Sequence, residues 1–124
     1  MPQHFKIEGE DFYCTVSGAS FTCTAPEVTA NGGTNSRRIS GSVSGWTLTG
    51  TRTDHSVGAP VAGGCVITQD YSWPEVIELK PDGTGYRHQS SGQWEETSSG
   101  GRCSEKHSAT VEGTEGPLSW SAIG

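Results

Sequence analysis

The stretch that decides the fold is Phe12-Tyr13-Cys14-Thr15-Val16-Ser17-Gly18-Ala19-Ser20-Phe21-Thr22-Cys23-Thr24. Its two halves carry β-branched and aromatic residues, and Gly18-Ala19 between them suits a two-residue type II′ turn with a positive φ at the glycine. That turn pairs residue 17 with 20, 16 with 21, 15 with 22 and 14 with 23. The stretch therefore predicts a β-hairpin of known register.

The same register brings two cysteines together. Cys14 and Cys23 face each other in the closer, non-hydrogen-bonded class of antiparallel pair, where a cross-strand disulfide can form. Four cysteines allow three pairings, and this pair leaves Cys65 to bond with Cys103 by elimination. Two disulfides in a small chain indicate a secreted or extracytoplasmic protein. The alternative is a cytosolic protein with reduced thiols.

Turn chemistry recurs along the rest of the chain. Residues 38–43 are predicted to turn at Ser44-Gly45 into residues 46–51. Residues 76–80 turn at Pro81-Asp82-Gly83 into residues 86–89, because proline, aspartate and glycine in that order suit a three-residue hairpin loop with a bulge. Further strands are expected at 65–68, 93–95, 109–111 and 118–122. The total is roughly nine to eleven short strands joined mostly by hairpins.

The composition supports an all-β fold with a thin core. Gly, Ser and Thr make up about 39% of the 124 residues, and Leu, Ile, Val and Phe only about 15%. The β-branched residues number 27 against 11 for Leu, Met and Ala together, which favours strands over helices. We predict a single disulfide-stabilised β domain over residues 1–124, built as a small antiparallel β-barrel. A two-sheet β-sandwich is the alternative.

Charge and hydropathy exclude several classes of protein. With 8 Lys and Arg and a net charge of −6, the chain lacks the basic footprint of a nucleic-acid binder. It contains no apolar run long enough for a membrane span. The first residues show no signal-peptide pattern, and we expect Met1 to be an added start ahead of a mature domain.

No catalytic or metal-binding motif identifies a reaction. The sequence contains no G-x-S-x-G, no H-E-x-x-H and no C-x-x-C. Asp54-His55-Ser56 holds the residue types of a catalytic triad, but sequential neighbours rarely reach the required geometry. The four histidines are scattered. No catalytic residue, metal site or cofactor is predicted.

The aromatic residues are the strongest candidates for function. Trp46, Trp94 and Trp120 are expected to supply core volume that Leu and Ile do not, because large aromatic side chains bury the most area. Tyr71 and Trp73 precede Pro74 on a predicted connection, where exposed rings suit recognition of a partner protein or a sugar. The candidate ligand-binding residues are Trp46, Tyr71, Trp73, Tyr86, His88 and Trp94.

Two short motifs resemble those of the calycin superfamily of small barrels, which includes lipocalins and avidins. They are Gly92-Gln93-Trp94, a G-x-W, and the hairpin Asp82-Gly83-Thr84-Gly85-Tyr86. The resemblance implies a calycin-like meander of hairpins. Lipocalins carry G-x-W on their first strand and append a helix, whereas here the motif lies far along the chain and no helix pattern follows. No family residues are carried over.

These observations favour a non-catalytic binding domain that recognises a protein, a glycan or a small apolar ligand. Its expected contact surface combines loops at 25–36 and 54–63 with Tyr71 and Trp73, because loops on rigid β scaffolds carry function. The alternative is a small-barrel enzyme of the cyclase or isomerase type. Such an enzyme would work in a hydrophobic lumen, with Glu78, Tyr86 or His88 facing the cavity by strand parity. A third possibility is an interaction module of a larger surface protein.

Overall fold

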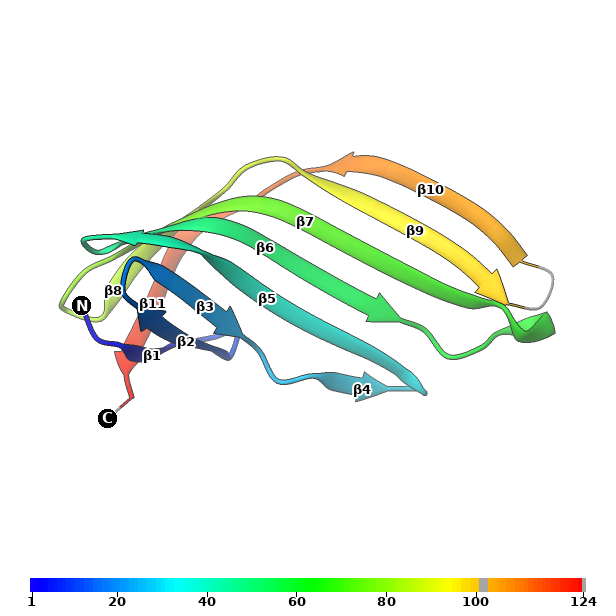
Figure 1. Ribbon diagram of the computed structural model, residues 1–124, viewed down its shortest axis with the longest axis horizontal. Helices are drawn as coiled ribbons and strands as arrows, with labels where there is room; N and C mark the ends of the chain where they lie inside the picture. Colours follow the sequence, from blue (N-terminus) through cyan, green and yellow to red (C-terminus); the bar gives the residue numbers. More distant parts are fainter. Residues whose placement is uncertain (101–102, 124) are drawn as a thin grey trace.

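The computed structural model describes residues 1–100 and 103–123, which form one antiparallel sheet (Figure 1). The elements are β1 (His4–Ile7), β2 (Phe12–Ser17), β3 (Ser20–Thr24), β4 (Val28–Ala30), β5 (Gly33–Ser44), β6 (Thr47–Val57), the short 3-10 turn η1 (Ala62–Gly64), β7 (Val66–Leu79), β8 (Thr84–Gln89), β9 (Gly92–Gly100), β10 (Cys103–Val111) and β11 (Glu115–Ala122).

Eight strands close into a barrel. The order β7-β6-β5-β3-β2-β1-β11-β8 returns to β7 through the β7–β8 pairing, and every pairing is antiparallel. Apart from β11, which closes the ring between β8 and β1, consecutive barrel strands are neighbours. The predicted all-β antiparallel barrel built as a meander is confirmed, and the sandwich alternative is not adopted.

The barrel is filled by its own side chains. Phe5, Phe12, Ile39, Leu48 and Ile77 are all completely buried, and a cluster that includes Phe21, Leu79, Trp120 and the Cys14–Cys23 disulfide surrounds them. Closing the sheet pairs its edges and buries one face of each strand. A chain with few aliphatic residues thereby obtains one compact core.

Three pairs of strands continue one another with little or no break in register. Gln89 pairs with Glu75 and Gln93 with Ser72, so residues 90–92 face residues 73–74 across a one-residue bulge between β8 and β9. A similar bulge at residues 25–27 joins β3 to β4 along β5. β10 pairs with β9 and β11 pairs with β8, and the register is the same in both pairings, so β11 continues β10.

The strands β5, β6 and β7 are much longer than β1 and β2, which help to complete the barrel. β5, β6 and β7 contain 12, 11 and 14 residues, whereas β1 and β2 contain 4 and 6. Beyond the ends of β1 and β2 the sheet is therefore open. We call this open part, made of β4, β9, β10 and the adjoining halves of β5, β6 and β7, the extension; it reaches to the right in Figure 1.

Pro74 lies where β7 changes partner. Residues 75–79 pair with β8, and residues 66–72 pair with β9. A proline has no N–H to donate to a ladder, and a bulge is one of the few places where a sheet tolerates it. The proline therefore occupies the boundary between the closed barrel and the extension.

The local predictions with the strongest turn chemistry are confirmed. The β2–β3 hairpin has the predicted register from Ser17–Ser20 to Cys14–Cys23. Both predicted disulfides, Cys14–Cys23 and Cys65–Cys103, are present. Gly83 has a φ of 91°, as the predicted Pro81-Asp82-Gly83 loop requires.

Three sequence predictions are wrong in placement. The β5–β6 turn is Gly45-Trp46, one residue later than expected, because Gly45 takes the positive-φ first position. The expected loops 25–36 and 54–63 contain β4 and the ends of β5 and β6. The expected connection at 70–74 is the middle of β7. These segments are polar strands of a sheet with no covering layer, so they lack the apolar alternation that identifies a half-buried strand.

Candidate functional site

The extension has two faces of different chemistry. Paired residues of antiparallel strands point to the same face, and Ile39, Leu48 and Ile77 identify the face that is continuous with the barrel interior. We call this surface the open face. Its members are Val28, Ala30, Asn35, Arg37, Asp54, Ser56, Ile67, Gln69, Tyr71, Trp73, Trp94, Glu96, Ser98, Glu105, His107 and Ala109.

The opposite face carries mainly small hydroxyl side chains. It includes Thr34, Ser36, Thr51, Thr53, Thr68, Ser72, Thr97, Ser99, Ser104, Ser108 and Thr110. Charged residues on this face pair with one another, as in His55–Asp70 at 2.5 Å and Lys106–Glu95 at 2.9 Å. Because the aromatic residues of the extension lie on the other side, the open face is the candidate binding surface.

Three aromatic residues form a row across the open face. The rings of Tyr71 and Trp73 are stacked, with centroids 5.3 Å apart and planes at 14°. Trp94 lies directly opposite Tyr71 on the neighbouring strand. Trp73 Nε1 donates to the carbonyl oxygen of Glu112 at 3.1 Å. Each of the three rings is half-buried, so the row is fixed in place and still reachable by a ligand.

Arg52 connects this row to the barrel core. Its guanidinium lies 5.2 Å from the centroid of the Phe12 ring and 5.8 Å from that of Trp73, at the distance of a cation–π contact. Its N–H groups donate to Asp54 at 2.9 Å and to Glu10 at 3.0 Å. Burial disfavours the charged guanidinium, but these carboxylates outweigh burial and raise the pKa of Arg52.

Glu10 joins two arginines at the end of the barrel. It accepts hydrogen bonds from Arg87 at 2.6 Å and from Arg52 at 3.0 Å. Burial disfavours the carboxylate, but the hydrogen bond and charge of Arg87 and the charge of Arg52 prevail and lower the pKa of Glu10. Glu10 therefore stays ionised and holds both guanidinium groups in place.

Glu75 is more deeply buried than Glu10 and lies next to Arg87. Its side chain is fully buried and forms an ion pair with Arg87. Burial raises the pKa of Glu75, and the positive charges of Arg87 and Arg52 offset only part of this effect. The pKa values of two carboxylates in one cluster are thus shifted in opposite directions, lowered at Glu10 and raised at Glu75.

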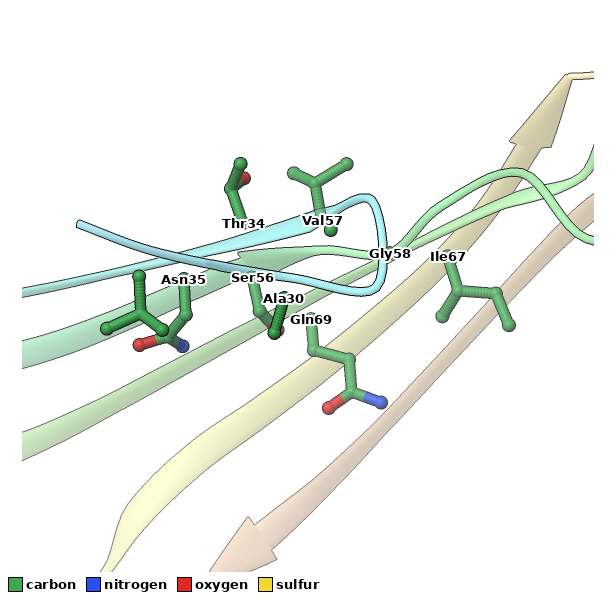
Figure 2. Close-up of a pocket in the computed structure, with 10 residues that line it drawn as sticks. Ala30, Thr34, Asn35, Ser56, Val57, Gly58, Ile67 and Gln69 are labelled. Atoms are coloured by element: carbon green, nitrogen blue, oxygen red, sulfur yellow. The ribbon is translucent and has the colours of Figure 1, made fainter.

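A hollow of about 400 Å³ lies at the far end of the open face. Figure 2 shows Ala30, Asn35, Ser56, Ile67 and Gln69 pointing to one side of the sheet there, whereas Thr34 and Val57 point to the other. Val28 completes the wall from β4. The hollow is therefore lined by aliphatic groups, side-chain amides and a hydroxyl.

The structure brings three of the six predicted ligand-binding residues together, namely Tyr71, Trp73 and Trp94. The others lie elsewhere. Trp46 packs against Trp120 at the closed end, with ring centroids 5.8 Å apart. Tyr86 and His88 lie on the outer surface of the barrel, with centroids 4.8 Å apart.

The expectation that Glu78, Tyr86 or His88 faces a lumen by strand parity is wrong. His88 and Glu78 pair with each other at 3.3 Å, and their side chains are 41% and 57% exposed. Gln89 and Glu75, one register pair away from His88, are the inward residues. Asp54-His55-Ser56 also forms no triad, because His55 points to the opposite face from its two neighbours.

The sequence analysis singled out neither Arg52 nor Gln69, and it placed Asn35 and Asp54 only within expected loops. Arg52, Asp54, Asn35 and Gln69 lie at every second position of their strands, but so do many polar residues of this chain. Only the pairing register of β5, β6 and β7 shows that these polar residues lie on the same face of the sheet. Of the predicted contact loops, residues from 28–35 and from 56–58 do contribute to the hollow, as strands and strand ends.

Comparison of the chain with protein families, with curated proteins and with solved structures finds no match. Within residues 1–100 and 103–123, no group of three or more His, Cys, Asp or Glu side chains is arranged to hold a metal ion. In the same part of the chain, no helix has the length and apolar character to cross a membrane.

Proposed function

We propose that this protein is an extracytoplasmic, non-catalytic binding domain that takes a glycan along its open face. The observation that carries the proposal is the row Tyr71, Trp73 and Trp94, with hydrogen-bonding side chains beside it. A sugar ring presents apolar C–H groups on its faces and hydroxyls at its rim. Aromatic faces pack against the former, and amides, carboxylates and guanidinium groups bind the latter.

The neighbours of the row supply fixed polar groups. Asp54 lies directly opposite Tyr71 on β6 and is held by Arg52. On the other side Glu96 accepts a hydrogen bond of 3.0 Å from Gln69. Groups that are already oriented lose less conformational entropy when a ligand binds. Several individually weak hydrogen bonds to sugar hydroxyls can therefore contribute to affinity together.

The other ligand classes fit the geometry less well. A small apolar ligand is usually enclosed over most of its surface, whereas the barrel interior is filled by residues such as Phe5 and Ile77. The same packed interior supports binding over the alternative of a reaction inside a hydrophobic lumen. Two disulfides support an oxidising location.

The test is a binding measurement with a panel of soluble oligosaccharides, by isothermal titration calorimetry. For the glycan that binds best, Tyr71→Ala is expected to raise the Kd about tenfold or more, since it removes a ring from the contact. Tyr86→Ala is the matched control, because Tyr86 is exposed on the outer surface and its loss should leave the Kd unchanged. Failure of every glycan to bind, or equal effects of the two variants, would overturn the proposal.

A further inference from the structure

The hollow described above adjoins the aromatic row along a single strand. Ile67, Gln69, Tyr71 and Trp73 are successive inward residues of β7, and such residues are spaced by about 6.6 Å. The hollow therefore begins one side-chain position from Tyr71. A group attached to a sugar ring that stacks on Tyr71 can reach it.

The walls of the hollow suit a small group with an apolar end. Val28, Ala30 and Ile67 contribute aliphatic carbon, and Val28 is 49% exposed although it is a large aliphatic residue. Because Val28 is open to solvent, a ligand can reach this wall. A methyl group placed there would remove apolar surface from water.

The polar side of the hollow suits an amide. Asn35, Ser56 and Gln69 point into it together (Figure 2). The carboxylate of Glu96 can only accept hydrogen bonds, so it fixes the Gln69 amide with its nitrogen toward Glu96, at 3.0 Å. The Gln69 oxygen then lies on the side of Asn35 and Ser56 (Figure 2), available to accept from an N–H. Side-chain amides donate and accept as an acetamide does.

We propose that the hollow is a subsite for the acetamido group of a 2-acetamido sugar, so that the glycan recognised by the open face contains N-acetylhexosamine. The methyl group contacts Ile67, the next residue to Gln69 on this face of β7, and Gln69 accepts from the acetamido N–H. Val28 and Ala30, on β4, form the far wall of the hollow. Asn35 and Ser56 can donate to its carbonyl oxygen. This inference rests on the proposed glycan function and adds the class of sugar.

The test compares two oligosaccharides of the same length and linkage, chitotetraose and cellotetraose, which differ at C2 by acetamido against hydroxyl. Calorimetry on the whole chain with both disulfides intact is expected to show binding about tenfold or more tighter for chitotetraose. Gln69→Leu should bring the two Kd values close together, because it removes the amide and keeps an aliphatic side chain of similar length. Thr68→Val, on the opposite face of the same strand, should keep the preference.

A second measurement needs no variant. In a two-dimensional NMR spectrum, titration with chitotetraose should move the side-chain amide signals of Gln69 and Asn35 and leave those of Gln3 and Gln93 in place. Equal binding of the two sugars, or a preference that Gln69→Leu retains, would overturn this inference while the glycan function stands. If neither these sugars nor any other glycan binds, the proposed function itself fails.

Discussion

The closed barrel and the extension are made from the same long strands, yet their inward side chains meet different environments. In the barrel, Leu48 and Ile77 are fully buried. Eight residues away on the same two strands, Ser56 and Gln69 line an open hollow. The difference arises because β1 and β2 end early and complete only one end of the ring. One sheet can thus provide a core at one end and an open surface at the other.

The largest expected difference between the two regions is in how much a substitution lowers the free energy of unfolding. Phe5→Ala, in the closed end, should lower the free energy of unfolding by about 3–5 kcal/mol, because it leaves a cavity in a filled core. Trp94→Ala, on the open face, should cost about 1 kcal/mol, since its half-buried ring has fewer contacts to lose. Urea denaturation of both variants under one set of conditions measures the difference. Equal losses would show that the extension shares the packing of the barrel.

The two disulfides extend the comparison. Cys14 and Cys23 are buried in the barrel core, 2% and 0% exposed. Cys65–Cys103 lies outside that core and joins β10 to the segment before β7, at the extension, with Cys65 6% exposed and Cys103 half-buried. Because open regions unfold locally more easily, dithiothreitol should reduce Cys65–Cys103 first under native conditions. Alkylation and mass spectrometry would identify the order.

Loss of Cys65–Cys103 should also lower stability. It closes a loop with a sequence separation of 38, and the chain-entropy model assigns about 4 kcal/mol to a loop of that length. The Cys65→Ser, Cys103→Ser double variant measures this loss by urea denaturation. A change well below 1 kcal/mol would mean that this disulfide does not stabilise the protein by restricting the denatured chain.

The carboxylates at the boundary between the two regions should make stability depend on pH. The pKa of Glu10 is lowered from its ordinary value of 4.5, so its stabilisation is present above that pH and is lost as the pH falls through the folded-state pKa. Glu10→Gln should cost about 2–3 kcal/mol at pH 7, because it removes the negative charge and replaces one of the two oxygens that accept from Arg52 and Arg87 by a donor NH2 group. That cost should shrink below pH 4.5.

Glu75 should show the opposite dependence on pH. Its pKa is raised, so its favourable contribution is present below pH 4.5 and is lost as the pH rises through the folded-state pKa. The stability of Glu75→Gln relative to the natural protein should therefore increase as the pH rises above 4.5. Urea denaturation of both variants from pH 3.5 to 8 tests the two signs, and parallel curves would contradict the assignment.

The parts of the fold that follow from local rules could be predicted from the sequence. Gly18-Ala19 fixes the register of one hairpin, and this register alone pairs Cys14 with Cys23. Pro81-Asp82-Gly83 defines another hairpin in the same way. The meander then follows, because successive hairpins place successive strands side by side.

The candidate site was only partly predictable. Tyr71, Trp73 and Trp94 were identified by residue type, but the segment that contains Tyr71 and Trp73 resembles a connection. A polar strand exposed on both faces has no apolar alternation, and Pro74 is unusual within a strand. Arg52 and Gln69 have no local signal. Their roles depend on partners far along the chain, Glu10 and Glu96.

The sequence by itself determined the strand class, the main turns and both disulfides, because each depends on backbone preferences within a few residues or on a count of cysteines. Only the tertiary structure decided where the barrel ends and the open face begins. That boundary depends on β11 pairing with β1, as in Trp120 opposite Ile7, and on β1 and β2 ending before their neighbours. Pairings so distant in sequence leave no local pattern, so β2 could be predicted from the sequence, whereas β1 and the open surface could not.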